Sequence, residues 1–124
     1  MVNKSKRIGT EGENYAVERA VHFFPGVDRA KTNNPGNDLN NRFPIPIEIR
    51  RRDRWEPQAW ARAQAEKFPD GQWAIWFMAR DRRKTDAPPN LIAFPEDFAL
   101  LLLWHWYASQ VLAGEVRQIE DMGD

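Results

Sequence analysis

Apolar residues near the start of the chain recur with the period of an α-helix. They fall at i, i+3, i+4 and i+7 in Val17, Ala20, Val21 and Phe24, which is the spacing of one face of an amphipathic helix. Thr10 and Glu13 have the form of a capping box that would open this helix, and Pro25 with Gly26 would end it. Residues 1–8 are polar and basic, and we expect them to form a flexible N-terminus.

Short strands rather than a further helix are predicted after residue 26. Short strands are predicted over 27–32 and at 38–39, with a dense Asn, Pro and Gly turn signal between them. A clearer strand is predicted over 43–50, where three isoleucines alternate with other residues. The isoleucines should face the core, while Glu48 and Arg50 should share the opposite face.

Pro44 and Pro46 restrict the pairing of that strand. Proline has no N–H to donate to a neighbouring strand, so two prolines two residues apart leave the same side unpaired. Either the strand lies at a sheet edge there, or regular pairing begins only around Ile47.

The second half of the chain continues the alternation of helices and strands. A helix is predicted from Pro57 to Phe68, because proline suits the first helical turn. The run 72–79 is almost continuously apolar, as expected of a strand buried on both faces. A short strand at 91–94 and a helix opening at Pro95 follow. The order α-β-β-β-α-β-β-α predicts an α/β fold with a mixed central β-sheet flanked by helices.

The last predicted helix is apolar on nearly every side between Leu100 and Tyr107. A helix of this kind should be buried rather than half exposed. Its apolar surface could form ordinary core, or its excess could close the interface of a homodimer. Both readings predict that little of it meets water.

The length and composition indicate one domain. A chain of 124 residues is too short for two independent cores, so we expect a single domain over 9–113, followed by an acidic tail over 114–124. The absence of cysteine excludes disulfides and thiolate metal sites. No apolar stretch is long enough for a membrane span and no signal peptide is recognisable, so a cytoplasmic protein is expected.

The net charge of zero hides an uneven distribution. Residues 1–90 carry 17 Lys and Arg against 12 Asp and Glu, whereas residues 91–124 carry one against six. Two basic clusters consist of Arg50, Arg51, Arg52 and Arg54, and of Arg80, Arg82, Arg83 and Lys84. Arginine binds phosphate through its planar fork, so these clusters are either a nucleic-acid-binding surface or ordinary solvated faces.

Three acidic residues are candidates for a metal site. Asp38 and Glu48 lie ten residues apart on neighbouring predicted strands, which a hairpin would bring together. Two carboxylates, a backbone carbonyl and waters suit Mg²⁺, which activates water and stabilises charge on a phosphate. Glu13 lies on the apolar stripe of its helix and should point toward the sheet.

Each of these acids also has a structural explanation. Glu48 could be a solvent-facing residue paired with an arginine. Asp38 could be a turn residue, and Glu13 could be half of the capping box. The chain has neither a phosphate-binding glycine loop with its lysine nor a serine nucleophile motif.

Taken together, three short motifs resemble those of the PD-(D/E)xK nuclease superfamily. They are the run 9–13 at a helix start, the run 36–38 after a turn and the run 47–50 on a strand. In particular they resemble the small phage-encoded Holliday-junction-resolvase-like endonucleases, and the likeness covers residues 7 to about 95. It implies a restriction-endonuclease-like core and a Mg²⁺ cofactor, with Mn²⁺ as a substitute.

The resemblance also implies roles for individual residues. The metal-binding acids of the family are matched by Glu13, Asp38 and Glu48. Arg29 matches a basic position before the aspartate, and Gln64 matches a helix position near the site. The family lysine two residues after the glutamate is Arg50 here, which keeps the charge but cannot deprotonate. Lys31, on a neighbouring predicted strand, could substitute for it.

The function expected from this resemblance is a metal-dependent, structure-selective DNA endonuclease that acts on branched or junction DNA. The catalytic set would be Glu13, Asp38, Glu48 and Arg50. The DNA-binding set would be Arg29, Lys31, Arg51, Arg52, Arg54, Gln64, Arg80, Arg82, Arg83 and Lys84. The arginine at position 50 motivates an alternative, a catalytically degenerate DNA-binding module. An interaction protein that uses the tryptophan-rich last helix is a third reading.

Overall fold

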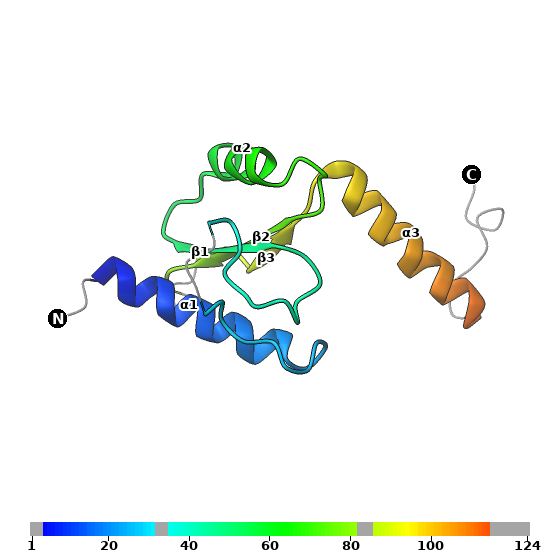
Figure 1. Ribbon diagram of the computed structural model, residues 1–124, viewed down its shortest axis with the longest axis horizontal. Coiled ribbons are helices and arrows are strands. Elements are labelled where there is room, and N and C mark those ends of the chain that lie inside the picture. Colours follow the sequence, from blue (N-terminus) through cyan, green and yellow to red (C-terminus); the bar gives the residue numbers. More distant parts are fainter. Residues whose placement is uncertain (1–3, 32–34, 82–85, 115–124) are drawn as a thin grey trace.

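Within residues 4–31, 35–81 and 86–114, which the computed structural model describes, the chain forms three helices and three strands (Figure 1). The helices are α1 (Lys4–Ala20), α2 (Pro57–Lys67) and α3 (Glu96–Leu112). The strands are β1 (Ile47–Arg52), β2 (Ala74–Ala79) and β3 (Leu91–Ala93). The predicted α/β class with a mixed sheet is confirmed.

The sheet has the order β1-β2-β3, with β2 in the centre. β1 runs parallel to β2, with Ile47 opposite Ala74, and β3 pairs antiparallel to β2. Every residue of β2 is buried, as its apolar run predicts. A central strand covered on both faces has no side on which polar residues could meet water.

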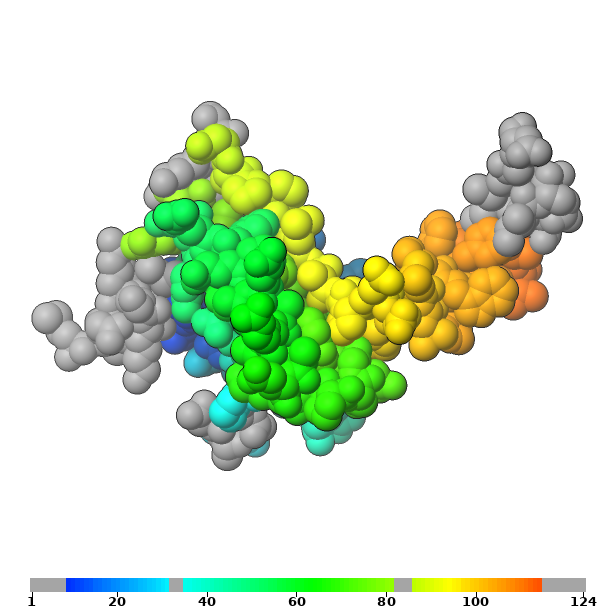
Figure 2. Space-filling view, turned by 90° about the horizontal axis from the view of Figure 1, so that it is seen from above, coloured from blue at the N-terminus to red at the C-terminus, as the bar shows by residue number. Residues whose placement is uncertain are grey.

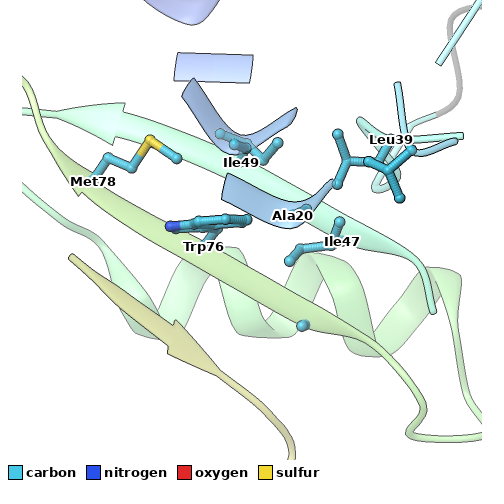
Figure 3. Close-up of a cluster of buried hydrophobic side chains, with 9 residues drawn as sticks. Ala20, Leu39, Ile47, Ile49, Trp76 and Met78 are labelled. Atoms are coloured by element: carbon cyan, nitrogen blue, oxygen red, sulfur yellow. The ribbon is translucent and has the colours of Figure 1, made fainter. Parts of the chain in front are cut away.

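Two helices cover the two faces of the sheet (Figure 1). On the α1 face, side chains of β1 and β2 pack on α1 and on a neighbouring loop (Figure 3); the labelled ones are Ala20, Leu39, Ile47, Ile49, Trp76 and Met78. On the α2 face, Trp60 packs against Phe77 with ring centroids 5.5 Å apart. Gly12 lets α1 approach closely, because a Cβ there would lie 3.2 Å from the Arg51 Cβ.

The first helix differs from its prediction at both ends. It begins at Lys4 rather than Thr10, so Thr10 lies inside the helix and the predicted capping box is wrong. It ends at Ala20, and the N–H of Phe24 donates to the carbonyl of Ala20 (2.8 Å) in the turn that follows. Proline disfavours helical backbone in the residue before it, here Phe24, so the turn at 21–24 separates the helix from Pro25.

Two of the predicted strands are not regular strands. In place of 27–32 and 38–39, the structure has one isolated antiparallel bridge between Arg29 and Leu39. The order in the described residues is therefore α-β-α-β-β-α. Both segments are short and flank a turn rich in Asn, Pro and Gly, so few residues remain for a ladder.

The strand predicted from residue 43 begins at Ile47. Ladder pairing with β2 starts at the residue after Pro46, which confirms the second of the two readings of the prolines. The Pro46 carbonyl still accepts a hydrogen bond from the N–H of Ala74 (3.0 Å). Proline loses its donor but keeps its acceptor, so it sits well immediately before the ladder.

The prediction that α3 is buried within the chain is wrong. None of its residues is buried, and the helix projects away from the sheet (Figures 1 and 2). Phe98, in its first turns, meets Phe94 edge to face with ring centroids 5.6 Å apart. Among the described helices, none is both long enough and apolar enough to cross a membrane.

Candidate functional site

Asp38 lies on an irregular segment that follows the outer edge of β1. Its N–H donates to the carbonyl of Ile47 (2.8 Å), and the N–H of Ile49 donates to its Oδ2 (2.6 Å). The N–H of Ile47 donates to Oδ1 of Asn37 (3.2 Å). These bonds satisfy the first residues of the open edge of β1, at Ile47 and Ile49, and hold the Asp38 carboxylate beside the strand that carries Glu48.

The turn before Asp38 is packed against α2. The Nε2 of Gln64 donates to the carbonyls of Gly36 (2.9 Å) and Ala74 (3.4 Å), and the Gln64 side chain is buried. Gly36 has φ +83°, and a Cβ there would come within 2.5 Å of Gln64 Oε1 and 2.8 Å of Phe68 Cε2. Only glycine fits this conformation in this space, so α2 fixes the approach of the chain to Asp38.

Glu48 lies on the face of β1 that is turned away from α1. Its Oε1 lies 3.1 Å from Nη2 of Arg50, and the exposed fraction of its side chain is 16%. The Arg50 guanidinium lies over the Trp60 ring, 5.3 Å from the ring centroid. Among the described residues, the buried Arg50 Nε has no hydrogen-bond partner. Arg50 is thus held by a carboxylate and an aromatic face, with donor capacity left over.

Glu13 reaches the same region from α1. Its Oε2 lies 3.5 Å from Nη2 of Arg29, and its side chain is 22% exposed. Burial raises the pKa of Glu13; the Arg29 charge opposes this rise and the Glu48 charge adds to it. The charge of Glu48 thus acts on Glu13, although the two residues belong to different elements.

Asp38 has the most perturbed acidity of the three. Burial raises its pKa from 3.8 to about 7, and the Glu48 carboxylate adds to the rise. The N–H of Ile49 and the charge of Arg50 lower it, and Glu13 raises it further. Negative charge is therefore crowded around a partly desolvated carboxylate, a condition that a bound cation relieves.

The chemistry of these donors suits a hard divalent cation. Asp38 and Glu48 offer carboxylate oxygens from adjacent segments, and Mg²⁺ is commonly held by one or two carboxylates with waters. Among the residues that the structure describes, no group of three or more His, Cys, Asp or Glu is placed to hold a metal ion. The arrangement thus fits a two-carboxylate site better than the three-acid site expected with Glu13.

The basic residues after Glu48 do not form one surface. Arg51 points toward α1, where Nη1 lies 2.7 Å from Oε2 of Glu11 and Nη2 donates to the Arg80 carbonyl (2.8 Å). Arg80 in turn lies 3.1 Å from Asp53. Side chains alternate across a strand, so consecutive arginines of β1 face opposite sides. The cluster of Arg50, Arg51, Arg52 and Arg54 is therefore divided between the two faces of the sheet and the loop after β1.

The other predicted DNA contacts divide into three groups. Lys31 and Arg54 are exposed, and Arg52 is half-buried. Gln64 is buried with 1% exposure and supports the turn before Asp38, so it is not placed to touch DNA. The remaining predicted contacts, Arg82, Arg83 and Lys84, lie outside the described residues.

Sequence reasoning missed two contributors to the site. The Oδ1 of Asn37 accepts a hydrogen bond from the N–H of Ile47; in the sequence Asn37 belongs to a turn signal, and an Asn directly before Asp38 also suits a side-chain cap. Trp60 carries Arg50 on its ring face, and no spacing in the sequence predicts that contact.

Comparisons with known proteins identify no relative of this chain. No family model matches it, and neither the curated proteins nor the solved structures contain a match.

Proposed function

We propose that this chain is a metal-dependent DNA endonuclease of the PD-(D/E)xK type, with a restriction-endonuclease-like core, that acts on branched or junction DNA. The observation that carries the proposal is the Asp38 carboxylate, held against β1 next to Glu48. Its pKa of about 7 reflects burial and neighbouring negative charge. A strongly perturbed carboxylate with a second carboxylate beside it is typical of functional sites.

In this proposal each residue has a defined task. A bound Mg²⁺ would lower the pKa of a water molecule and stabilise charge on the scissile phosphate. Asp38 and Glu48 would supply the ligands, in a geometry that the turn on α2 keeps rigid. Arg50, whose charge is permanent, would donate to a phosphate oxygen. Glu13 and Arg29 would set the charge balance on the α1 side.

A second function, DNA binding without cleavage, rests on Arg50. Its guanidinium already contacts Glu48 at 3.1 Å and lies over Trp60. An arginine cannot deprotonate and is larger than the lysine of the related motif. The same scaffold would then bind DNA with a steep dependence on salt and leave the phosphodiester intact.

Cleavage assays decide between the two functions. The protein is incubated with four-way, forked, duplex and single-stranded DNA, with Mg²⁺, with Mn²⁺ and with EDTA. We expect metal-dependent cleavage of branched DNA that is lost in Glu48→Gln, which keeps the size of the side chain. Glu18→Gln is the matched control, because Glu18 is exposed on the same molecule. Equal cleavage by Glu48→Gln and the parent would exclude this site.

The variant Arg50→Lys tests the binding-only alternative. If the parent binds DNA but does not cut it, while Arg50→Lys cuts with Mg²⁺, the native site is a degenerate nuclease site. If neither protein cuts any substrate but both bind, a DNA-binding module is the better description. Absence of binding at low salt would remove both proposals.

A further inference from the structure

Helix α3 presents an apolar surface that the rest of its own chain does not cover. Leu103, Trp104 and Trp106 are 60%, 57% and 57% exposed, and none of the helix is buried. No charged residue occurs between Asp97 and the end of the helix at Leu112. Exposed apolar patches of this extent mark interaction sites, so the helix needs a partner.

An open apolar groove lies beside the base of α3. It has a volume of about 690 Å³ and lies between the turn after α1, the sheet and the first turns of α3. Aromatic and aliphatic side chains line most of it, among them Phe23, Phe24, Phe43, Phe94, Phe98 and Leu102. Phe23 is 80% exposed at its rim. Figure 2 shows that α3 projects away from the body of the molecule.

The helix and the groove are complementary within one chain. A groove can cover only one side of a helix, whereas α3 is apolar on nearly every side and needs a second apolar neighbour. In a twofold pair, the groove of one copy would cover one side of α3, and the α3 of the other copy would cover another. Such a pair is isologous, because the same patch serves both copies.

Area and charge favour a second copy as the occupant. The exposed leucines and tryptophans of α3 leave on the order of 800 Å² of apolar surface open, about what each partner contributes to a standard interface. The net charge of the chain is zero, so two copies approach each other without strong repulsion.

We propose that the chain forms a homodimer in which each α3 docks onto the apolar groove and the α3 of a second copy. The interface is centred on Leu103 and Trp106 of α3 and on Phe23 at the groove rim. It uses no residue of the carboxylate site, so it stands whether or not the protein cleaves DNA.

The oligomeric state in solution tests this proposal, without DNA or metal. Light scattering after size exclusion, repeated across the micromolar range, should give twice the chain mass of 14.5 kDa for the parent. Leu103→Glu and Phe23→Glu should each give the mass of one chain, because a charge in an apolar contact is costly. Ala65→Glu, at an exposed position of α2, should remain a dimer. A cooperative urea unfolding transition in all four proteins checks that the body formed by the sheet, α1 and α2 is folded.

Three results would overturn the proposal. A single-chain mass for the parent at every concentration would show that α3 folds back on its own groove or serves another partner. Binding of that monomeric parent to phosphatidylcholine and phosphatidylglycerol vesicles would assign the helix to a lipid surface. A dimer that persists in both Leu103→Glu and Phe23→Glu would place the interface elsewhere.

Discussion

At the scale of single residues, the ionised form of Asp38 that a metal ligand needs is the form that destabilises the folded, metal-free protein. Burial of the Asp38 carboxylate raises its pKa to about 7, and the charges of Glu48 and Glu13 add to that rise. The hydrogen bond from the N–H of Ile49 stabilises the ionised form, but it offsets only part of the effect of burial. A carboxylate whose ionised form is destabilised in the metal-free protein is expected at a site where a bound cation or a substrate supplies positive charge.

Asp38→Asn should therefore stabilise the metal-free protein at neutral and higher pH. The folded-state pKa of Asp38 is raised above its ordinary value of 3.8, so its contribution to stability is full below 3.8 and is lost as the pH rises through about 7. We expect the parent to lose ~2 kcal/mol of unfolding free energy over that range, after allowance for solvent screening, relative to Asp38→Asn. Urea unfolding in EDTA at several pH values measures it.

The matched control for this measurement is Asp28→Asn. Asp28 is exposed and accepts a hydrogen bond from the N–H of Arg29, so its replacement removes a nearby charge without touching the site. Its stability should follow the parent across the whole pH range. If Asp38→Asn also follows the parent, the carboxylate is not desolvated as the structure indicates.

How far the site was predictable depends on the kind of interaction. Asp38 and Glu48 were foreseen as neighbours because an acid after a turn and an acid in an apolar strand are both visible in the sequence. The buried hydrogen bonds of Gln64 were not, since its polar side chain on a helix reads equally well as a surface residue. The contact of Arg50 with Trp60 depends on how α2 docks, which no local pattern encodes.

At the scale of elements, the turn before Asp38 and helix α2 behave as one unit. Gly36 and Gly71 both have positive φ, at 83° and 75°. A Cβ at Gly36 would meet Gln64 and Phe68, whereas a Cβ at Gly71 would meet nothing within 4 Å. The pair separates the cost of the backbone conformation from the cost of the steric contact.

Gly36→Ala should destabilise the protein more than Gly71→Ala. The backbone conformation alone should cost roughly 1 kcal/mol in Gly71→Ala, while the added overpacking should bring the loss in Gly36→Ala to about 3 kcal/mol. Urea unfolding of both variants and the parent gives the two differences. Equal losses would mean that the turn moves away from α2 freely, and that α2 does not position Asp38.

Regular elements were predictable where burial alone decides them. The apolar run of β2 and the proline at the start of α2 gave both elements close to their observed bounds. The two short strands predicted on either side of the turn are not formed. Segments this short carry too few residues for the sequence to distinguish a strand from a single bridge. For α3 the helix itself was predicted correctly, but its burial within the chain was not. Hydropathy indicates that an apolar surface is buried against something, but not whether the partner is the same chain or another.

At the scale of the whole molecule, the chain divides into a packed body and an unsupported helix. The buried clusters join α1 and α2 to the sheet, and α3 contributes no buried residue to either. A lone helix of 17 residues is marginal in water, because its own hydrogen bonds do not outweigh the entropy lost in nucleating and ordering its backbone. The order of α3 should therefore depend on association, while the body should hold its fold alone.

Amide hydrogen exchange at different protein concentrations should make this division visible. Protection of the α3 amides should fall as the protein is diluted through the dissociation range, because opening is then limited by the dimer equilibrium. Protection in β2, the buried centre of the sheet, should stay constant. In Leu103→Glu the α3 amides should exchange rapidly at every concentration, with β2 unchanged. Concentration-independent protection of α3 in the parent would contradict the coupling, because the helix would then be stabilised within a single chain.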